Sequence, residues 1–184
     1  VGVELEGKTL VVIGLGKIGQ RVCRKGKALG MTVIGCDPYV TAEDARSFGA
    51  ESSDQESALA RADFISLHPP LNDSTRGMVN DEFIASCKNG VRIINVSRGP
   101  VIDQAALIRG IDAGKVAGAA LDVFEQEPPA QDDPFRNHPG IICTPHLGAS
   151  TVEAQDNVGI QSAHQMVAFL SKGKVDNAVN APRF

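Results

Sequence analysis

Short apolar runs alternate with longer amphipathic segments along most of this chain. The runs are uniformly apolar, which is typical of strands that are covered by helices on both faces of a sheet. Strands that alternate with helices indicate βαβ units and therefore a parallel sheet. The sequence thus predicts an α/β fold, a doubly wound parallel sheet that forms a single domain.

The predicted elements follow one another from residue 9 to about residue 170. Strands are expected at residues 9–13, 32–36, 63–67, 91–96, 116–121 and 141–143. Helices are expected at about residues 18–29, 42–48, 54–61, 80–87, 103–113 and 151–170, with Thr41, Asp54 and Asp103 as N-caps. The irregular stretch 124–140 is too long for an idle connection, so we expect it to have a function.

Composition excludes several classes of protein. The 184 residues contain 18 Lys and Arg against 22 Asp and Glu, a net charge of −4, which argues against sequence-independent nucleic-acid binding. No apolar run approaches the roughly 18 residues of a membrane span. The first residues, 1–7, lack the regions of a signal peptide, and the missing initiating Met suggests a piece of a longer protein.

The four cysteines, at positions 23, 36, 87 and 143, are too far apart to form a metal-binding pair. Cysteines of this kind are typical of buried, reduced thiols in a cytosolic protein. We therefore expect a cytoplasmic protein without a metal site.

A glycine motif, G-x-G-x-x-G, covers Gly14–Gly19 between the first strand and the first helix. In this context Gly14 permits a tight turn, Gly16 lets the backbone approach a pyrophosphate, and Gly19 lets the helix pack close to the strand. The N-terminus of the helix then offers free N–H groups to the anion. The motif predicts a Rossmann fold that binds a dinucleotide.

Asp37 ends the second strand, 18 residues after Gly19. A carboxylate near this distance accepts hydrogen bonds from the adenosine ribose and repels a 2′-phosphate. Pro38 and Tyr39 follow, and no nearby Arg or Lys could receive that phosphate. The sequence therefore predicts NAD rather than NADP, with a turn before Pro38 as the purely structural interpretation of Asp37.

Polar side chains follow three predicted strands, and parallel strands bind ligands beyond their carboxyl ends. These side chains are Ser97, Arg98, Asp122, Thr144 and His146. An Arg, an Asp and a His are thus expected to border one crevice. The purely structural interpretations are a surface charge for Arg98 and a turn cap for His146, and a structural role is favoured for the histidines at 68, 138 and 164.

Residues of these types suit hydride transfer between an alcohol and a ketone. A His can take the hydroxyl proton near neutral pH, and an Arg can hold a carboxylate with two hydrogen bonds. The His needs a carboxylate to orient it and to raise its pKa. Glu125 and Glu127 are the candidates; spacing alone does not choose between them, and either could be a solvated loop acid.

Four motifs, in this order, resemble the D-isomer-specific 2-hydroxy acid dehydrogenase family. They are Gly14–Gly19, Asn95–Gly99, Ala120–Pro128 and Thr144–Ala149. The resemblance covers nearly the whole chain. It implies an NAD-dependent enzyme whose substrate is a small 2-hydroxy acid.

Further stretches resemble the members of that family that oxidise phosphoglycerate, the first step of serine synthesis. These are Glu4–Thr9, Gly30–Pro38, Pro145–Thr151 and Ala178–Ala181. Two other functions on this fold stay open: a hydroxypyruvate or glyoxylate reductase, and a transcriptional corepressor gated by NAD. Preference for NADP would favour the reductase, and Asp37 argues against that preference.

The resemblance also implies roles for individual residues. Arg98 matches the substrate-binding arginine of the family, His146 matches its catalytic histidine, and Glu127 matches the acid that pairs with the histidine, which selects it over Glu125. The positions that match cofactor contacts are Lys17, Ile18, Pro69, Val96, Ser97, Arg98, Asp122, His146, Leu147, Gly148 and Ala149.

Members of the family also have a second domain, which closes over the cofactor and contacts the substrate. Here the predicted sheet and helices use all residues from 8 to about 170. We therefore expect residues 1–184 to be the NAD-binding domain alone, with the substrate-binding domain absent from this chain. The resemblance implies that the full-length protein is a homo-oligomer.

Overall fold

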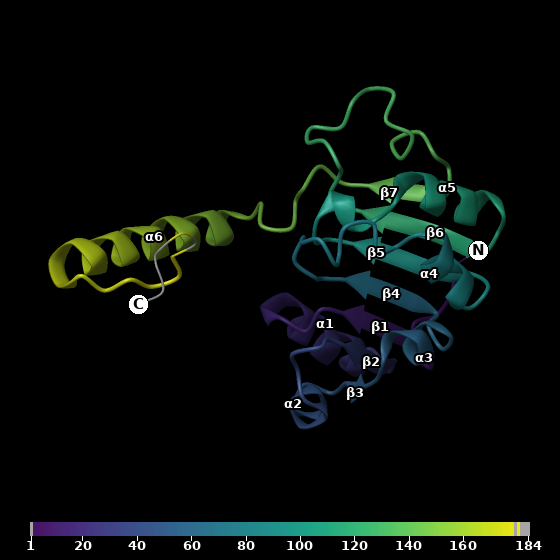
Figure 1. Cartoon of the computed structure of the whole chain (residues 1–184), viewed down its shortest axis with the longest axis horizontal. Helices are drawn as coiled ribbons and strands as arrows, with labels where there is room; N and C mark the ends of the chain where they lie inside the picture. Colours follow the sequence, from purple (N-terminus) through teal and green to yellow (C-terminus); the bar gives the residue numbers. More distant parts are fainter. Residues whose placement is uncertain (1, 179, 181–184) are drawn as a thin grey trace. The chain divides into compact units, whose positions relative to one another are not determined.

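The computed structural model describes residues 2–178 and residue 180. These residues form two compact units, one that ends at Pro145 and one that begins at His146. The first unit contains a seven-stranded sheet with the strand order β3-β2-β1-β4-β5-β6-β7 (Figure 1). All neighbouring strands pair in parallel, so the predicted α/β fold is confirmed.

The predicted elements of the first unit are all present. The strands are β1 (Thr9–Ile13), β2 (Thr32–Cys36), β3 (Glu51–Ser52), β4 (Phe64–Leu67), β5 (Val91–Asn95), β6 (Val116–Leu121) and β7 (Ile141–Cys143). The helices are α1 (Lys17–Ala28), α2 (Ala42–Ser47), α3 (Gln55–Leu59), α4 (Asp81–Ser86) and α5 (Gln104–Asp112). Strand β3 and the 3-10 turn η1 (Gly99–Val101) were not predicted, because both are short and lack an apolar run.

Side chains of β1 point alternately into two separate cores. Val11 and Ile13 belong to the core beneath α3, α4 and α5, whereas Leu10 and Val12 belong to the core beneath α1 and α2. The doubly wound arrangement is therefore confirmed. Cys23, Cys36 and Cys87 are buried in these cores as predicted, and burial raises the pKa of each thiol to about 11.

Within the first unit, the helices leave one side of β5, β6 and β7 without a covering helix. The core beneath α1 and α2 extends only as far as Phe64 of β4. Beyond it, Arg92 and Ile94 of β5 are half-buried, and Ile142 of β7 is 71% exposed. This part of the sheet borders an open cavity of about 370 Å³.

Capping side chains start most of the helices. Thr41, Asp54 and Asp103 accept hydrogen bonds from the N–H groups of the residues three positions later, at distances of 3.1, 2.9 and 3.0 Å. All three predicted N-caps are therefore confirmed. Helix α1 differs, because its N-cap is Gly16, which has no side chain to accept a hydrogen bond.

The second unit is built on the long helix α6 (Val152–Lys172), which begins at the N-cap Thr151 and ends at Gly173. The first unit, which contains the sheet, ends at Pro145, whereas the expected single sheet with its helices extended to about residue 170. None of the helices among the described residues is both long and apolar enough to cross a membrane. Of the stretch Ala178–Ala181, residues 179 and 181 lie outside the described residues.

Candidate active site

The strand order reverses between β1 and β4, and ligands of open parallel sheets bind at such a point. Here the carboxyl ends of β1, β2 and β4 border a cavity of about 450 Å³. Its lining residues are Ile13, Gly14, Cys36, Asp37, Pro38, Tyr39, Ser53, Gln55, Pro69, Pro70, Asn72, Ser74, Thr75 and Met78. Sequence reasoning found Gly14, Asp37 and Pro69 but missed the segment 70–78, which shows no motif.

The glycines of the phosphate loop, Gly14–Gly19, have the backbone geometry and close packing that the motif predicts. Gly14 has a φ of 89°, in the left-handed region that favours glycine. A Cβ on Gly19 would lie 2.0 Å from the carbonyl oxygen of Gly14, so α1 packs directly against the loop. A Cβ on Gly16 would meet nothing within 4 Å, which leaves open space on the loop for a pyrophosphate.

The N-terminus of α1 has neither a capping side chain nor an acidic residue in its first turn, which favours the binding of an anion there. Helices α2, α3, α4 and α6 each have an acidic residue in the first turn and a side-chain cap. Helix α1 has neither. Its first N–H groups and the positive end of its dipole are therefore left for a bound anion.

Asp37 connects the end of β2 to the phosphate loop. Its Oδ2 accepts a hydrogen bond from the N–H of Leu15 at 2.7 Å, and its Oδ1 accepts one from the N–H of Tyr39 at 2.8 Å. Each oxygen keeps a second lone pair that can accept a ribose hydroxyl. Asp37 can therefore stabilise the turn before Pro38 and bind a ribose at the same time. The residues that line this cavity include no Lys or Arg.

A second cavity, of about 470 Å³, adjoins the first. The two share Pro69 and Pro70, and the second is also lined by Ile18, His68, Leu71, Val96, Ser97 and Arg98. The structure therefore brings together five of the predicted site residues from three separate segments, namely Ile18, Pro69, Val96, Ser97 and Arg98. Two neighbouring cavities therefore lie between Asp37, which lines the first, and Arg98, which lines the second.

Arg98 is positioned by Asn95, the last residue of β5, which is only 1% exposed. The Asn95 side chain donates to the Arg98 carbonyl at 2.9 Å and accepts from the N–H and the hydroxyl of Ser97. The exposed Arg98 guanidinium donates to the Ser97 carbonyl at 2.6 Å. Sequence reasoning gave Asn95 no role, although a polar residue at the end of an apolar strand was the available signal.

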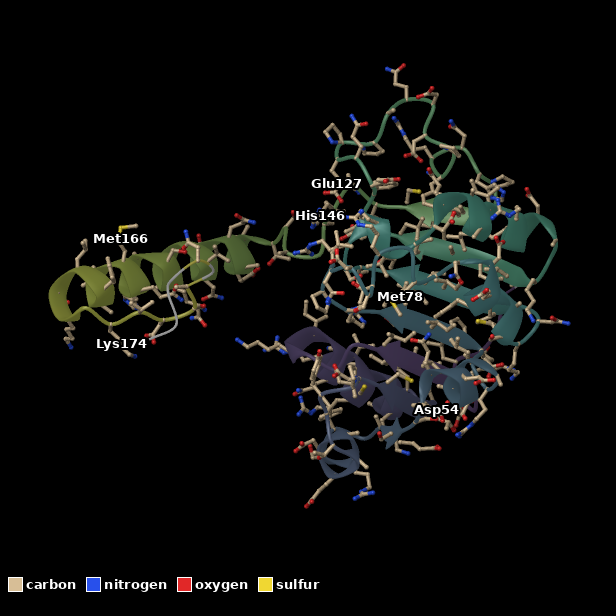
Figure 2. The ribbon with its side chains drawn as sticks, viewed as in Figure 1. Asp54, Met78, Glu127, His146, Met166 and Lys174 are labelled. Atoms are coloured by element: carbon tan, nitrogen blue, oxygen red, sulfur yellow. The ribbon has the colours of Figure 1, made fainter. Side chains whose placement is uncertain are left out.

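The turn that follows Arg98 lies against the loop that carries Glu127. A Cβ on Gly99 would be 2.0 Å from the carbonyl carbon and oxygen of Phe124, so only glycine fits there. The N–H of Phe124 in turn donates to Oε1 of Glu127 at 3.0 Å. Figure 2 shows Glu127 on this loop, beyond the end of β6.

The ends of β5, β6 and β7 are joined by hydrogen bonds, as the parallel sheet predicts. The N–H of Asp122 donates to the Asn95 carbonyl at 3.0 Å, and the Thr144 hydroxyl donates to Oδ1 of Asp122. Asp122 is 7% exposed. Asn95, Asp122 and Thr144 therefore lie together at one edge of the sheet.

His146 begins the second unit, two residues after Thr144, and Leu147, Gly148 and Ala149 follow it there. Its φ of 56° is in the left-handed region, which non-glycine residues rarely adopt and which is found disproportionately at functional sites. The pairing of His146 with Glu127 and the catalytic role of Arg98 stay predictions.

The other histidines have the following surroundings. His138 contacts Oδ1 of Asp112 through Nε2 at 3.1 Å, and its Nδ1 accepts from the N–H of Gly140, which agrees with a structural role. His68 contacts the Ser66 hydroxyl at 2.8 Å, while its buried Nδ1 has no partner among the described residues. Burial lowers the pKa of His68 to about 4, so this ring is neutral at pH 7. His164 lies within α6.

A doubly wound parallel sheet with this glycine loop and an acid after β2 defines a dinucleotide-binding domain. Residues 1–148 match the family model described as D-isomer specific 2-hydroxyacid dehydrogenase, NAD binding domain. The chain belongs to this family, and NAD is its cofactor.

Among curated proteins, the chain is similar to several phosphoglycerate dehydrogenases. It is 52% identical over 183 residues to D-3-phosphoglycerate dehydrogenase 2, chloroplastic, of Arabidopsis thaliana, covering 99% of this chain and 29% of that protein. It is 49% identical to D-3-phosphoglycerate dehydrogenase of Bacillus subtilis and 44% identical to the human protein, in each case covering 34% of the relative. These two matches cover 99% and 98% of this chain.

Solved structures of the family have the same fold. A glyoxylate reductase from Paecilomyes thermophila has a TM-score of 0.89 at 34% identity, covering 97% of this chain and 54% of that one. D-lactate dehydrogenase from Aquifex aeolicus, complexed with NAD and lactic acid, has a TM-score of 0.83 at 34% identity, covering 92% of this chain and 55% of that one. The chain thus spans about a third of the curated relatives and just over half of these structures.

Proposed function

We propose that this chain is the NAD-binding part of an enzyme that transfers hydride between NAD and a D-2-hydroxy acid. The substrate class that fits best is phosphoglycerate, whose oxidation begins serine synthesis. The observation that carries the proposal is the pair of neighbouring cavities, one lined by Gly14 and Asp37 and the other by Arg98. The similarity to proteins named D-3-phosphoglycerate dehydrogenase supports the choice of substrate.

In this proposal Arg98, Glu127 and His146 supply the chemistry. Arg98 binds the substrate carboxylate, because a guanidinium holds a carboxylate with two parallel hydrogen bonds. His146 removes the proton of the C2 hydroxyl while NAD accepts the hydride from C2, and Glu127 orients the imidazole and stabilises its charged form. The shared Pro69 and Pro70 allow one ligand to extend through both cavities.

The proposal separates cofactor binding from catalysis. The phosphate loop and Asp37 come from one sheet, so we expect the 184-residue chain to bind NAD. Catalysis needs the substrate to be positioned and water to be excluded, and positioning can account for roughly 7–11 kcal/mol of a barrier. We propose that a substrate-binding domain elsewhere in the full-length protein supplies this, with residues 1–184 as the NAD-binding domain alone.

Two measurements test the proposal. Saturation-transfer NMR should detect NAD binding to this chain, whereas an NADH fluorescence assay with phosphoglycerate should show turnover at least about a thousandfold below that of the full-length enzyme. Near-full activity of this chain would contradict the need for a second domain. A panel of 2-hydroxy acids on the full-length protein should give the highest kcat/KM with phosphoglycerate.

The second candidate function is a hydroxypyruvate or glyoxylate reductase, which the structural similarity to a glyoxylate reductase favours. The same substrate panel distinguishes the two. A preference for glyoxylate or hydroxypyruvate with NADPH would support the reductase and contradict our assignment. Asp37, with no basic residue lining its cavity, is the feature that favours the dehydrogenase.

We further propose that the full-length protein is a cytoplasmic homo-oligomer with small-molecule substrates and no nucleic-acid partner. The half-open sheet face, with Ile142 71% exposed, supports an oligomer, because large exposed apolar areas mark interaction surfaces. Light scattering on the full-length protein tests the oligomeric state. A fluorescent fusion tests the location, and an electrophoretic mobility assay tests nucleic-acid binding, for which the net charge of −4 predicts none.

A further inference from the structure

Helix α1 carries an unusual concentration of positive charge for an acidic protein. Its 12 residues include five cations and no acid, namely Lys17, Arg21, Arg24, Lys25 and Lys27. The rest of the chain then has 13 Lys and Arg (18 − 5) against 22 Asp and Glu, a net charge of −9. The positive charge of the protein is thus gathered on the helix that starts at the phosphate loop.

The five cations of α1 are exposed, and none of them takes part in an ion pair within the described residues. The guanidinium of Arg24 lies 5.9 Å from the ring centre of Phe48, which leaves its charge uncompensated. By contrast, Arg61, Lys88 and Arg109 each pair with a carboxylate at 2.6–2.7 Å. No ion pair with a described carboxylate therefore neutralises the charges on α1.

The position of these charges along α1 is set by helix geometry. The buried side of the helix contains Gly19, Cys23 and Gly26. At 100° per residue, four of the cations fall on the other side and Lys27 falls on the flank. With a rise of 1.5 Å per residue, Arg21 and Arg24 lie about 6 and 10 Å beyond Lys17 along the axis. Lys25 and Lys27 lie about 12 and 15 Å beyond it.

The charges of α1 have different effects at its two ends: Lys25 and Lys27, in the last turn, favour the helix, whereas the first turn is unfavourable. Acidic residues stabilise the first turn and basic residues destabilise it, each by about 0.3–1 kcal/mol. Lys17 is the first residue of α1, and the first turn contains no acid. Lys17 and the positive end of the dipole therefore add to one positive field beside the phosphate loop, and Arg21 and Arg24 extend it along the helix.

We propose that the exposed cationic face of α1 captures the anionic dinucleotide from solution and speeds its association with the phosphate loop. Arg21 and Arg24 act at a distance, since clustered charges of one sign raise the association rate of an oppositely charged ligand. The proposal rests on NAD as the cofactor. It assigns these two arginines to the rate of association and not to contacts in the bound complex.

Stopped-flow fluorescence with NADH tests the proposal on this 184-residue chain. The double variant R21Q/R24Q removes the two charges nearer the loop, and K25Q/K27Q removes two charges from the same helix farther away. At 0.1 M ionic strength, where the Debye length is about 10 Å, we expect R21Q/R24Q to lower the association rate constant about threefold. K25Q/K27Q should have little effect, and above about 0.5 M both should match the parent.

At about 0.01 M, where the Debye length is about 30 Å, both variants should associate more slowly than the parent. Dissociation rates should agree within about twofold at every salt concentration. Equal association rates for R21Q/R24Q and the parent at 0.01 M would overturn the proposal, as would a loss confined to the dissociation rate. Failure of the parent to bind NADH at equilibrium would overturn the cofactor assignment as well. Circular dichroism checks that both variants keep the fold.

Discussion

The carboxylate of Asp37, at the end of β2, accepts a hydrogen bond from the N–H of Leu15 inside the phosphate loop at 2.7 Å. Its other oxygen accepts from the N–H of Tyr39 at 2.8 Å. One side chain therefore holds the loop and also lines the cavity where we propose that the adenosine ribose binds. Substitutions of Asp37 should consequently affect both cofactor choice and the stability of the loop.

We expect NAD to bind at least about tenfold more tightly than NADP, because Asp37 repels a 2′-phosphate and no basic residue lines the cavity. Asp37→Ala should narrow this difference and lower the stability of the domain by about 1 kcal/mol, since the N–H of Leu15 loses its acceptor. Asp37→Asn keeps an oxygen that can accept a hydrogen bond from the N–H of Leu15. It should therefore narrow the difference between NAD and NADP affinity with a smaller loss of domain stability. Calorimetric titration with both nucleotides provides the affinities; equal affinities in the parent would contradict the assignment.

Alanine substitutions at two glycines of the phosphate loop should have different effects: one should lower the stability of the domain, and the other should lower its affinity for NAD. In Gly19→Ala the new Cβ would lie 2.0 Å from the backbone oxygen of Gly14, and we expect a loss of about 3 kcal/mol in the free energy of unfolding. Gly16→Ala meets nothing within 4 Å, so the loss should be below about 1 kcal/mol. Its Cβ would instead occupy the space left for the pyrophosphate, and NAD affinity should fall at least about tenfold. Urea denaturation and NAD titration of the two variants give these values, and a stable Gly16→Ala variant with unchanged affinity would refute the role of that space.

The proposed catalytic residues can be tested in the full-length protein. His146→Ala should lower kcat by about 10²–10⁴ with a much smaller change in NAD affinity. Glu127→Gln should shift the pH–rate profile to lower pH, because the histidine loses the carboxylate that raises its pKa. Glu125→Gln is the matched control, and a shift with it but not with Glu127→Gln would show that the partner is Glu125. Arg98→Ala should act mainly on KM for the hydroxy acid.

His68 should make the domain sensitive to acid. Burial lowers the pKa of its imidazole from 6.5 to about 4 in the folded chain, so between these pH values the unfolded chain binds a proton that the folded chain does not. The contribution of His68 to stability is therefore intact above pH 6.5 and is lost as the pH falls toward 4. Allowing for solvent screening of this partly exposed ring, the loss should be about 2 kcal/mol.

The variant His68→Gln isolates this effect from the titration of the carboxylates. Urea denaturation at several pH values from 7 to 4 should show that the stability difference between the parent and His68→Gln changes in favour of the variant as the pH falls. Parallel curves for the two proteins would show that the histidine titrates normally. Because His68 also lines the cavity beside Arg98, NAD affinity should be measured on the same samples.

The order and the type of the elements follow from the sequence because apolar runs, cap residues and glycine signals act over a few neighbouring residues. This is why β1, β2, β6 and β7 have their predicted bounds, and why Thr41, Asp54 and Asp103 cap helices as expected. The glycine motif and Asp37 are likewise local signals, and they identified the cofactor. The short strand β3 has no such pattern and was missed.

Tertiary structure decided the features that depend on contacts between distant segments. Only the folded chain shows that Gly99 is required by the backbone of Phe124, 25 residues away (124 − 99), and that Thr144 donates a hydrogen bond to Asp122. The Asp37–Leu15 hydrogen bond likewise joins two segments that are far apart in the sequence. The sequence also did not predict the open side of β5, β6 and β7 within the first unit, because an apolar run does not reveal which helix covers it. Local patterns determine which elements form, whereas the register and packing of a parallel sheet determine which of their side chains meet.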